Sequence, residues 1–185
     1  MTKKRWIFLV SALVVVITPQ AYVVPVLAGS RPDVGSGALL LTDPSAATNS
    51  PSTEWKLSDS DMDGGEIGRT WTGPRGSAIF MAVTRYSNPV LADFYYWAID
   101  PTNDKGDGWS PPQAYTSVSA DRSKTVCEVG ASSSGCQRWE YWARYGQYLV
   151  RAGYDALGDE GIQMGTEEFN RYARYVDGLV STQLS

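Results

Sequence analysis

The run QRWEYWARYGQYLVRAGYDA, residues 137–156, constrains the fold more than any other part of the sequence. Trp139 and Tyr141 alternate with Glu140 and Trp142, and strict alternation places the two sets on opposite faces of a β-strand. The central RYGQ is typical of a tight turn, and the YLV that follows has the composition of a second strand. The run therefore predicts a β-hairpin, and with it an antiparallel sheet.

A strand and a helix are predicted before this hairpin. GSAIFMAVTRYS, residues 76–87, is dense in β-branched and apolar side chains, as in a buried strand. Asn88 and Pro89 then suit the N-cap and the first position of a helix. The apolar side chains that recur at helical spacing in this segment are Val90, Leu91, Phe94, Tyr95 and Ala98.

A second helix is predicted after the hairpin. Thr166 suits its N-cap, and Glu167 and Glu168 favour the positive end of the helix dipole. One apolar face is formed by Phe169, Tyr172, Ala173, Val176, Leu179 and Val180. Taken in order, the elements predict an α+β fold in which helices pack on one face of an antiparallel sheet.

Residues 1–28 have the composition of a segment that directs the chain out of the cytoplasm. Three basic residues at positions 3–5 precede an uncharged apolar run, and a second apolar stretch ends at Ala28. Two interpretations stay open: a signal peptide that is cleaved after Ala28, or a membrane anchor over residues 6–28, which is long enough to cross about 30 Å of hydrocarbon. Either one places residues 29–185 outside the cytoplasm, in a protein that is secreted or anchored in the cytoplasmic membrane.

The two cysteines agree with export. Cys127 and Cys136 bracket EVGASSSG directly before the hairpin, and an even number in an exported chain predicts a disulfide. A disulfide that closes a loop of this length stabilises the folded state by about 2–3 kcal/mol in the chain-entropy model. A redox pair would require the spacing C-x-x-C, which these cysteines lack.

Composition divides the exported part in two. Residues 29–53 are rich in Gly, Ser, Pro and Thr, which predicts a flexible linker over residues 29–54, with Ala38–Leu41 docking as a short element. The extracytoplasmic α+β domain then occupies residues 55–185.

Charge and the lack of histidine exclude several functions. From Gly29 onward the chain has 13 basic and 20 acidic residues, net −7, so nucleic acid is not an expected partner. With no histidine, Ser-His-Asp and Cys-His catalysis and histidine-based zinc sites cannot form. No catalytic residue is predicted, and the expected class is non-enzymatic.

The stretch SDSDMDGGE resembles the first half of a calcium loop. Asp59, Asp61 and Asp63 fall at positions 1, 3 and 5 of an EF-hand loop, and a glycine follows at position 6. Position 12 is Thr70, where such loops have a bidentate glutamate. Weak calcium binding by the three aspartates and Glu66 is one interpretation, and a solvated acidic turn is the other.

The chain is rich in aromatic residues, with 7 Trp and 11 Tyr. Tyr95, Tyr96 and Trp97 are consecutive, so one helix cannot bury all three on one side. We therefore expect an exposed aromatic patch that marks a binding surface. The candidate binding aromatics are Tyr96, Trp97, Trp139 and Trp142.

The order of elements resembles a broad group of exported bacterial domains, which includes the extracytoplasmic sensor-like domains of some serine/threonine kinases and related small lipoproteins. The matching segments are LSDSDMDGG, AIFMAVTRYSNPVLADFYYW, the pattern W-x-Y-x-x-R-Y-G-Q-Y-L-V, and FNRYARYVDGLV. Several members have more than one disulfide, whereas this chain can form only one. The resemblance implies an α+β domain outside the cytoplasm that binds or senses a ligand, and it implies no catalytic residues.

These features lead to one expected function and two alternatives. We expect a binding, sensing or accessory domain, which could be a membrane-anchored subunit of an envelope complex with a protein or glycan as partner. The first alternative is a carboxylate-based hydrolase acting on glycans, with Asp93, Glu140 and Asp155 as candidate acids. The second is a calcium-stabilised carbohydrate-binding or adhesion module.

Overall fold

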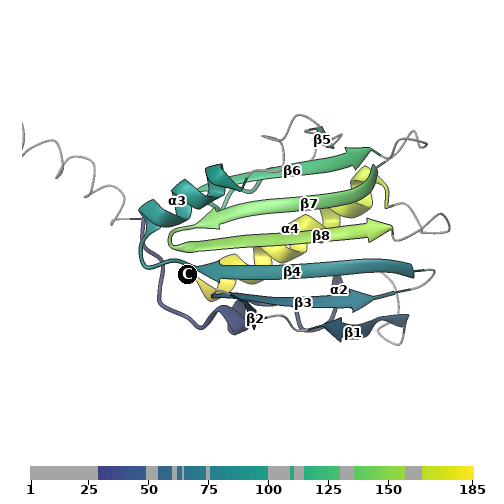
Figure 1. The fold of residues 1–185 in the computed structure, drawn as a ribbon, viewed down its shortest axis with the longest axis horizontal. Helices are drawn as coiled ribbons and strands as arrows, with labels where there is room; N and C mark the ends of the chain where they lie inside the picture. Colours follow the sequence, from purple (N-terminus) through teal and green to yellow (C-terminus); the bar gives the residue numbers. More distant parts are fainter. Residues whose placement is uncertain are drawn as a thin grey trace, which may run out of the picture.

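The predicted hairpin lies in the middle of one antiparallel sheet (Figure 1). The computed structural model describes residues 29–48, 54–59, 62–63, 65–73, 76–99, 109–110, 115–129, 136–156 and 164–185. Strands β7 (Cys136–Tyr145) and β8 (Tyr148–Ala156) pair from Arg138 opposite Asp155 to Tyr145 opposite Tyr148. The hairpin and its two-residue turn are therefore confirmed.

The other strands extend the sheet on both sides of the hairpin. The order of the eight strands is β1-β3-β4-β8-β7-β6-β5, with β2 paired to β3, and every pair is antiparallel. Their bounds are β1 (Lys56–Asp59), β2 (Met62–Asp63), β3 (Glu66–Thr72), β4 (Ser77–Arg85), β5 (Trp109–Ser110) and β6 (Arg122–Val129). Strand β4 confirms the strand predicted over residues 76–87.

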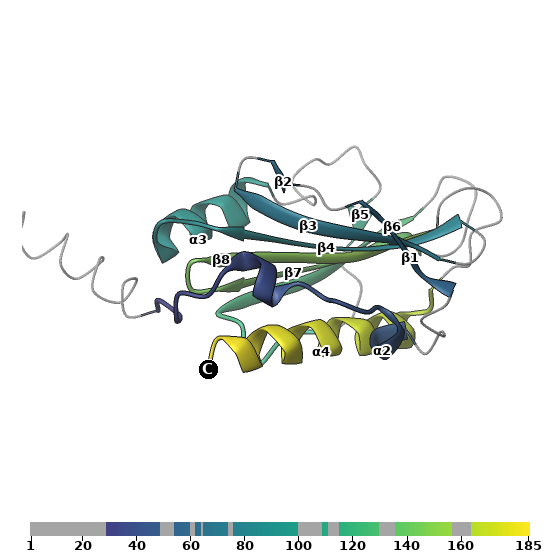
Figure 2. The same cartoon turned by 90° about the horizontal axis from the view of Figure 1, so that it is seen from below.

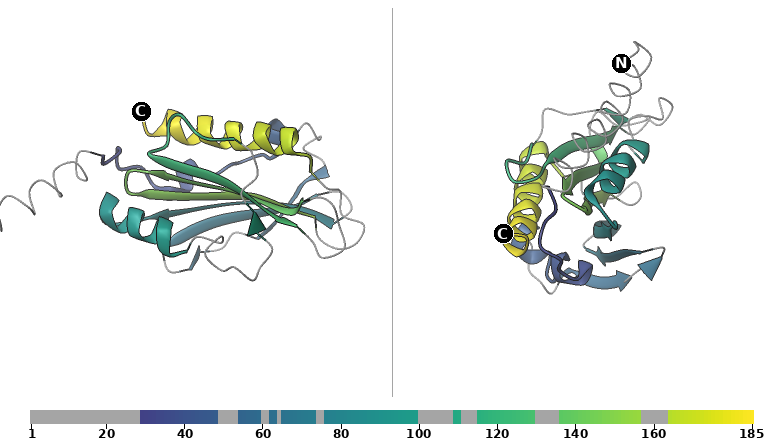
Figure 3. Two further views of the ribbon diagram at one scale, coloured as in Figure 1. Left: turned by 90° about the horizontal axis from the view of Figure 1, so that it is seen from above. Right: turned by 90° about the vertical axis from the view of Figure 1, so that its left-hand side faces the viewer.

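Helices cover both faces of the sheet (Figures 2 and 3). Helix α4 (Thr166–Gln183) lies on one face with the short helices η1 (Ser36–Leu39) and α2 (Ser45–Thr48), whereas α3 (Pro89–Ala98) lies on the other. The α+β class is confirmed, but the prediction that helices pack on one face is wrong. The reason lies in strand β7, where Tyr141 packs in the core beneath α4 and the next residue, Trp142, packs with Tyr96 of α3.

Helix α4 buries the face that its sequence predicts. Its core contact includes a stack of Phe169 on Trp139 with the ring centroids 5.1 Å apart. The N-cap residue is Gly165 and Thr166 is the first helical residue, so that prediction is off by one residue. The buried apolar residues of the helix are Phe169, Tyr172, Ala173, Val176 and Val180, and Leu179 packs partly buried beside them.

Helix α3 buries the side opposite to the one predicted. The Asn88 side chain accepts a hydrogen bond from the Leu91 backbone N–H at 3.0 Å and Pro89 is the first helical residue, so the predicted start is confirmed. The side that contacts the sheet contains Ala92 and Tyr96. Tyr96 packs there with Trp142 and Leu149 of the hairpin, and these contacts between distant segments decide which side is buried. The predicted apolar face is exposed at Val90, Leu91, Phe94, Tyr95 and Ala98.

Residues 29–48 pack on the domain, in contrast to the linker expected over residues 29–54. Leu39, Leu40 and Leu41 belong to the main core, where each is at most 2% exposed. The Leu41 carbonyl accepts a hydrogen bond from Arg69 Nη1 at 3.0 Å. The docking expected at Ala38–Leu41 is therefore confirmed, and the folded domain includes residues 29–48 as well as those from Trp55 onward.

The first described residues are held at the turn between β7 and β8. The Gln147 side chain accepts from the Arg31 backbone N–H at 2.9 Å and donates to the Arg31 carbonyl at 2.8 Å. Gly146 has φ +57°, and a Cβ at this position would lie 2.5 Å from the Gly29 carbonyl oxygen. The Gln147 carbonyl also accepts from the Tyr86 backbone N–H at 2.9 Å, shortly before α3. Residue 29 and α3 thus lie at the same end of the sheet (Figures 1–3).

The disulfide predicted from the sequence joins two neighbouring strands. Cys127 lies in β6 and Cys136 begins β7, with their Cα atoms 5.5 Å apart. The bond therefore links the edge of the hairpin to the strand that precedes it, as expected.

Within the residues that the structure describes, no helix is both long and apolar enough to cross a membrane. Residues 1–28, for which the sequence predicts a signal peptide or an anchor, lie outside the described part.

We predict that Gly146→Ala lowers the free energy of unfolding by about 1–3 kcal/mol, because the residue has a left-handed backbone conformation that an L side chain rarely adopts. The added methyl group would also contact Gly29 and Arg31. Urea unfolding followed by circular dichroism measures the change.

A matched control is Gly178→Ala in α4, where an added Cβ has no heavy atom within 4 Å. This substitution should stabilise the protein by about 0.5–1 kcal/mol through helix propensity. Equal stability of the two variants would contradict the strained turn.

Candidate functional site

Helix α3 is attached to the sheet by a small buried contact. Tyr96 is 8% exposed and packs with Trp142, Leu149 and Val126, and Tyr86 packs against the same cluster. The cluster is separate from the main core because it lies on the opposite face of the sheet. Tyr96 is therefore the side chain of α3 that belongs to this cluster.

The single acidic residue of α3 also points toward the sheet. Asp93 Oδ1 lies 2.9 Å from Arg122 Nε and 3.2 Å from Arg144 Nε. These two arginines lie on the strand face that α3 covers. The charge of the helix is therefore paired on its inner side, and its outer side has no ionisable group other than the Tyr95 phenol.

The outer side of α3 is a contiguous apolar surface. Phe94 and Trp97 are the most exposed of its large side chains, at 63% and 61%. Of the ten exposed large apolar residues in the described part of the chain, six lie between positions 90 and 99. Scattered exposed apolar residues are ordinary, whereas a contiguous patch marks an interaction surface. We call this surface the α3 apolar face; it consists of Val90, Leu91, Phe94, Tyr95, Trp97 and Ile99.

Aromatic contacts order the rings of this face. Tyr95 stacks on Tyr86 with the centroids 4.8 Å apart, and Phe94 meets Tyr95 edge-on at 5.5 Å. Burial raises the pKa of Tyr86, and the neighbouring Tyr95 and Glu66 add to this effect. The rings are therefore preorganised, which lowers the entropy lost when a partner binds them.

Of the four candidate binding aromatics, only Trp97 is exposed. Tyr96, Trp139 and Trp142 are buried, at 8%, 2% and 2% exposure. Trp139 Nε1 donates to the Met164 carbonyl at 2.9 Å, and Trp142 Nε1 donates to Glu140 Oε2 at 2.7 Å. These three rings therefore stabilise the fold instead of forming a surface, whereas the exposed aromatic patch expected from the sequence is present on α3.

A buried glutamate lies on the same face of the sheet as α3. Glu140 is 2% exposed, and its Oε1 lies 2.6 Å from Arg138 Nη2. Its Oε2 accepts from Trp142 and lies 3.7 Å from Arg151 Nη2. The Arg151 guanidinium also stacks 4.5 Å above the Trp142 ring. The two arginines compensate the buried charge, which would otherwise destabilise the fold.

The candidate acids do not form an evident catalytic pair. Asp155 lies opposite Arg138 in the strand register, and burial raises its pKa; Arg138 lowers it and Glu140 raises it further. Of the other two candidates, Glu140 is the one whose charge acts on Asp155. Both of its carboxylate oxygens, however, are already bound by arginine or by the Trp142 indole. Asp93 lies on α3 and is paired with arginines. A hollow of about 200 Å³ lies nearby, and its lining includes Arg138, Arg151, Phe80, Glu66 and Thr70.

The acidic segment forms part of the sheet edge. Asp59 ends β1 opposite Thr70, and Asp63 in β2 pairs with Glu66 at the start of β3. Glu66 Oε2 accepts a hydrogen bond from Thr84 Oγ1 at 3.1 Å. Asp61 lies outside the described residues. In the described ranges no group of three or more His, Cys, Asp or Glu residues is placed to hold a metal ion, and calcium binding stays a prediction.

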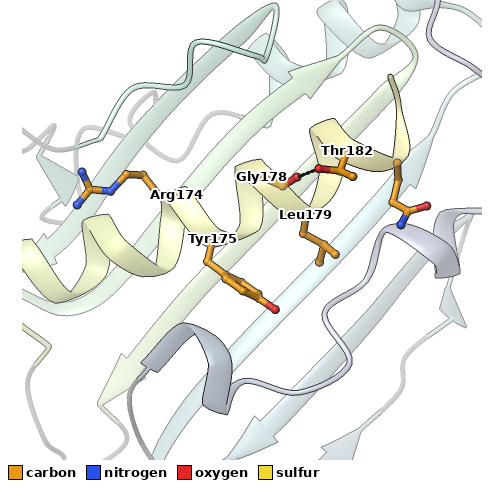
Figure 4. A pocket seen from close by; sticks show the side chains of 6 residues that line it. Arg174, Tyr175, Gly178, Leu179 and Thr182 are labelled. Carbon is orange, nitrogen blue, oxygen red and sulfur yellow. Dashed lines mark hydrogen bonds between the residues drawn. The ribbon is translucent and has the colours of Figure 1, made fainter.

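A shallow hollow of about 460 Å³ runs along the outer side of α4 (Figure 4). Tyr175 and Leu179 point to one side of the helix, toward residues 29–48, whereas Arg174 points away from them. Thr182 Oγ1 donates to the Gly178 carbonyl at 2.7 Å. The hollow is open and has few polar groups, so it defines no particular ligand chemistry.

A second buried carboxylate joins α4 to the sheet. Asp177 is 4% exposed, and its Oδ2 accepts from the Tyr115 hydroxyl at 2.6 Å. Its Oδ1 accepts from Ser117 at 2.6 Å and from Tyr145, with Tyr141 at 3.3 Å. Four hydroxyl groups thus compensate the buried charge, which identifies Asp177 as a structural anchor.

Burial raises the pKa of the phenols around this anchor. For Tyr115, burial, the hydrogen bond to Asp177 and the charge of Asp177 together raise the pKa to about 12. The pKa values of Tyr141 and Tyr145 are also raised, chiefly by burial. Burial alone raises the pKa of Tyr172 in the same core.

Comparison of the chain with models of known protein families, with curated proteins and with solved structures finds no match in any of the three. The function of the chain is therefore inferred from its own residues and geometry.

Sequence patterns missed which side of α3 is exposed, although one signal was present. The segment PVLADFYYWA has a single charged residue and apolar side chains on all sides. A helix that is apolar all round is either enclosed on all sides or leaves an apolar face exposed. The second outcome applies here, because α3 is attached through Ala92 and Tyr96 only on its inner side.

We predict that Asp177→Leu lowers the free energy of unfolding by more than Asp177→Asn, which should cost about 1–3 kcal/mol. Asparagine keeps one acceptor oxygen, whereas leucine leaves the hydroxyl groups of Tyr115, Ser117 and Tyr145 without this acceptor. Urea unfolding measures both variants, and Glu167→Gln at an exposed position of α4 is the control. Similar stability in all three proteins would show that the anchor is dispensable.

We predict a separate loss of stability at alkaline pH. The folded-state pKa values of the core phenols are raised above about 10, the ordinary value for tyrosine. The neutral phenols therefore make their full contribution to the free energy of unfolding below pH 10. It is lost as pH rises from 10 through the folded-state value, which is about 12 for Tyr115. Urea unfolding between pH 8 and 11, with tyrosinate absorbance, tests this. Tyr145→Phe should flatten the pH dependence, and an unchanged slope would contradict the assignment.

Proposed function

We propose that this chain is a non-enzymatic binding or accessory domain that acts outside the cytoplasm, at the surface of the membrane into which residues 6–28 insert when they are not cleaved. The observation that carries the proposal is the α3 apolar face, which lies at the end of the sheet where residue 29 begins the fold. The partner class is a component of the cell envelope.

Several features support an extracytoplasmic location. The Cys127–Cys136 disulfide is compatible with it. The basic residues at positions 3–5 and the apolar residues that follow have the order of an export segment. The packing of residues 29–48 on the domain leaves little slack between this segment and the sheet.

The titratable groups favour binding over catalysis. Glu140 and Asp93 are held by arginines, and Asp177 is enclosed by hydroxyl groups. A glycan hydrolase needs one carboxyl group to donate a proton and a second to act as base or nucleophile. Glu140, Asp93 and Asp177 have structural partners instead, which makes the hydrolase the weaker candidate.

We predict that a photo-reactive amino acid at Trp97 forms adducts with an envelope component in native cells, because this side chain lies on the α3 apolar face. Leu57 is the matched control, since it is 57% exposed against 61% for Trp97 and lies on β1 at the far edge of the sheet. Intact mass of the protein from membranes and from the medium shows whether residues 1–28 are retained.

Adducts at position 97 with few at position 57 support the proposal, whether the captured component is protein, lipid or glycan. Equal yields at both positions, or none at position 97, would remove the α3 apolar face as a binding surface.

A further inference from the structure

We infer that the α3 apolar face lies in the lipid–water interface of the membrane that holds residues 6–28. The inference rests on the proposed function, because it requires the domain to be retained at a membrane. It adds the identity of the occupant: the outer surface of the bilayer itself.

The composition of the α3 apolar face suits this environment. It combines Trp97, Phe94 and Tyr95 with three aliphatic side chains, and tryptophan and tyrosine are enriched where a membrane meets water. Asp93, the one charged residue of the helix, is paired with Arg122 and Arg144 on the inner side. No charged side chain of the helix therefore opposes insertion of its outer side.

The position of α3 follows from the turn between β7 and β8. Gln147 binds the backbone of Arg31 on one side and the backbone of Tyr86 on the other. Arg85 at the end of β4 also forms an ion pair with Asp33, at 2.6 Å. The first residues after the apolar segment and the residues leading into α3 are thus joined at one point.

No spacer in the sequence separates the apolar segment from this point. The apolar segment ends at Ala28, and Gly29 already packs against Gly146. Helix α3 has ten residues, which makes it about 15 Å long, and it lies at the same end of the sheet as residue 29. An anchor over residues 6–28 therefore brings α3 to the bilayer surface.

The tether also explains how so short a helix could bind lipid. A single helix of this length, without a basic face, binds membranes weakly when free in solution. Covalent attachment to an inserted segment makes the contact intramolecular and raises its effective concentration. Because the domain is acidic, we expect the contact to depend on apolar insertion and to form on zwitterionic as well as anionic lipids.

The test uses the full chain in phosphatidylcholine nanodiscs, with an environment-sensitive dye on Phe94→Cys. Leu57→Cys is the control, because the two positions are 63% and 57% exposed and both native cysteines are in the disulfide. A nitroxide on the lipid acyl chains should lower the fluorescence at position 94 by about twofold or more, as expected for a probe at the headgroup–acyl boundary, and leave position 57 nearly unchanged. Adding Trp97→Ser to the labelled chain should reduce the quenching.

Other occupants give different results. Fluorescence at position 94 that resists the quencher and changes with the number of chains per disc would show that a second copy covers the face, and would overturn the inference. A shielded probe that resists the quencher at one chain per disc would indicate cover by another part of the chain, with the same consequence. Adducts with protein at position 97 in cells, together with no quenching in nanodiscs, would overturn the lipid contact and leave the proposed function standing.

Discussion

Strand β7 carries large aromatic side chains on both faces, and the rest of the structure depends on this. Trp139 and Tyr141 face α4, whereas Trp142, the residue after Tyr141, faces α3. A sheet with one face in water needs helices on the other face only. A strand with apolar side chains on both faces needs other elements to pack on each of them. Helix α4 supplies the main cover, and α3 supplies a small one through Ala92 and Tyr96, which leaves its outer side exposed.

Two buried carboxylates fix these layers without extending the apolar core. Asp177 binds hydroxyl groups from β7 and from residues 115–117, so that α4 has one rotation on the sheet. Glu140 forms ion pairs with Arg138 and Arg151 on the opposite face. Such groups are costly to bury unless every partner is in place. They therefore select one arrangement of the layers.

Sequence periodicity predicted the hairpin, β4 and both long helices, because local alternation and helical spacing determine these features. The even number of cysteines in an exported chain predicted the disulfide. It could not predict which side of α3 would be buried, since that depends on Trp142 and Leu149 from a distant hairpin. It also assigned residues 29–54 to a linker from their Gly, Ser and Pro content, although Leu39 and its neighbours enter the core. The exposed aromatic patch was expected, but three of its four candidate residues proved to be buried.

The turn at Gly146 and Gln147 connects the fold to the proposed function. It binds the first described residues on one side and the residues leading to α3 on the other, so the position of α3 is fixed relative to Arg31. In the anchored form that we propose, this direct connection would determine how the domain is oriented on the membrane, which a flexible linker would not do. In the proposed arrangement, with α3 against the bilayer, α4 lies on the opposite face of the sheet and is turned away from the lipid.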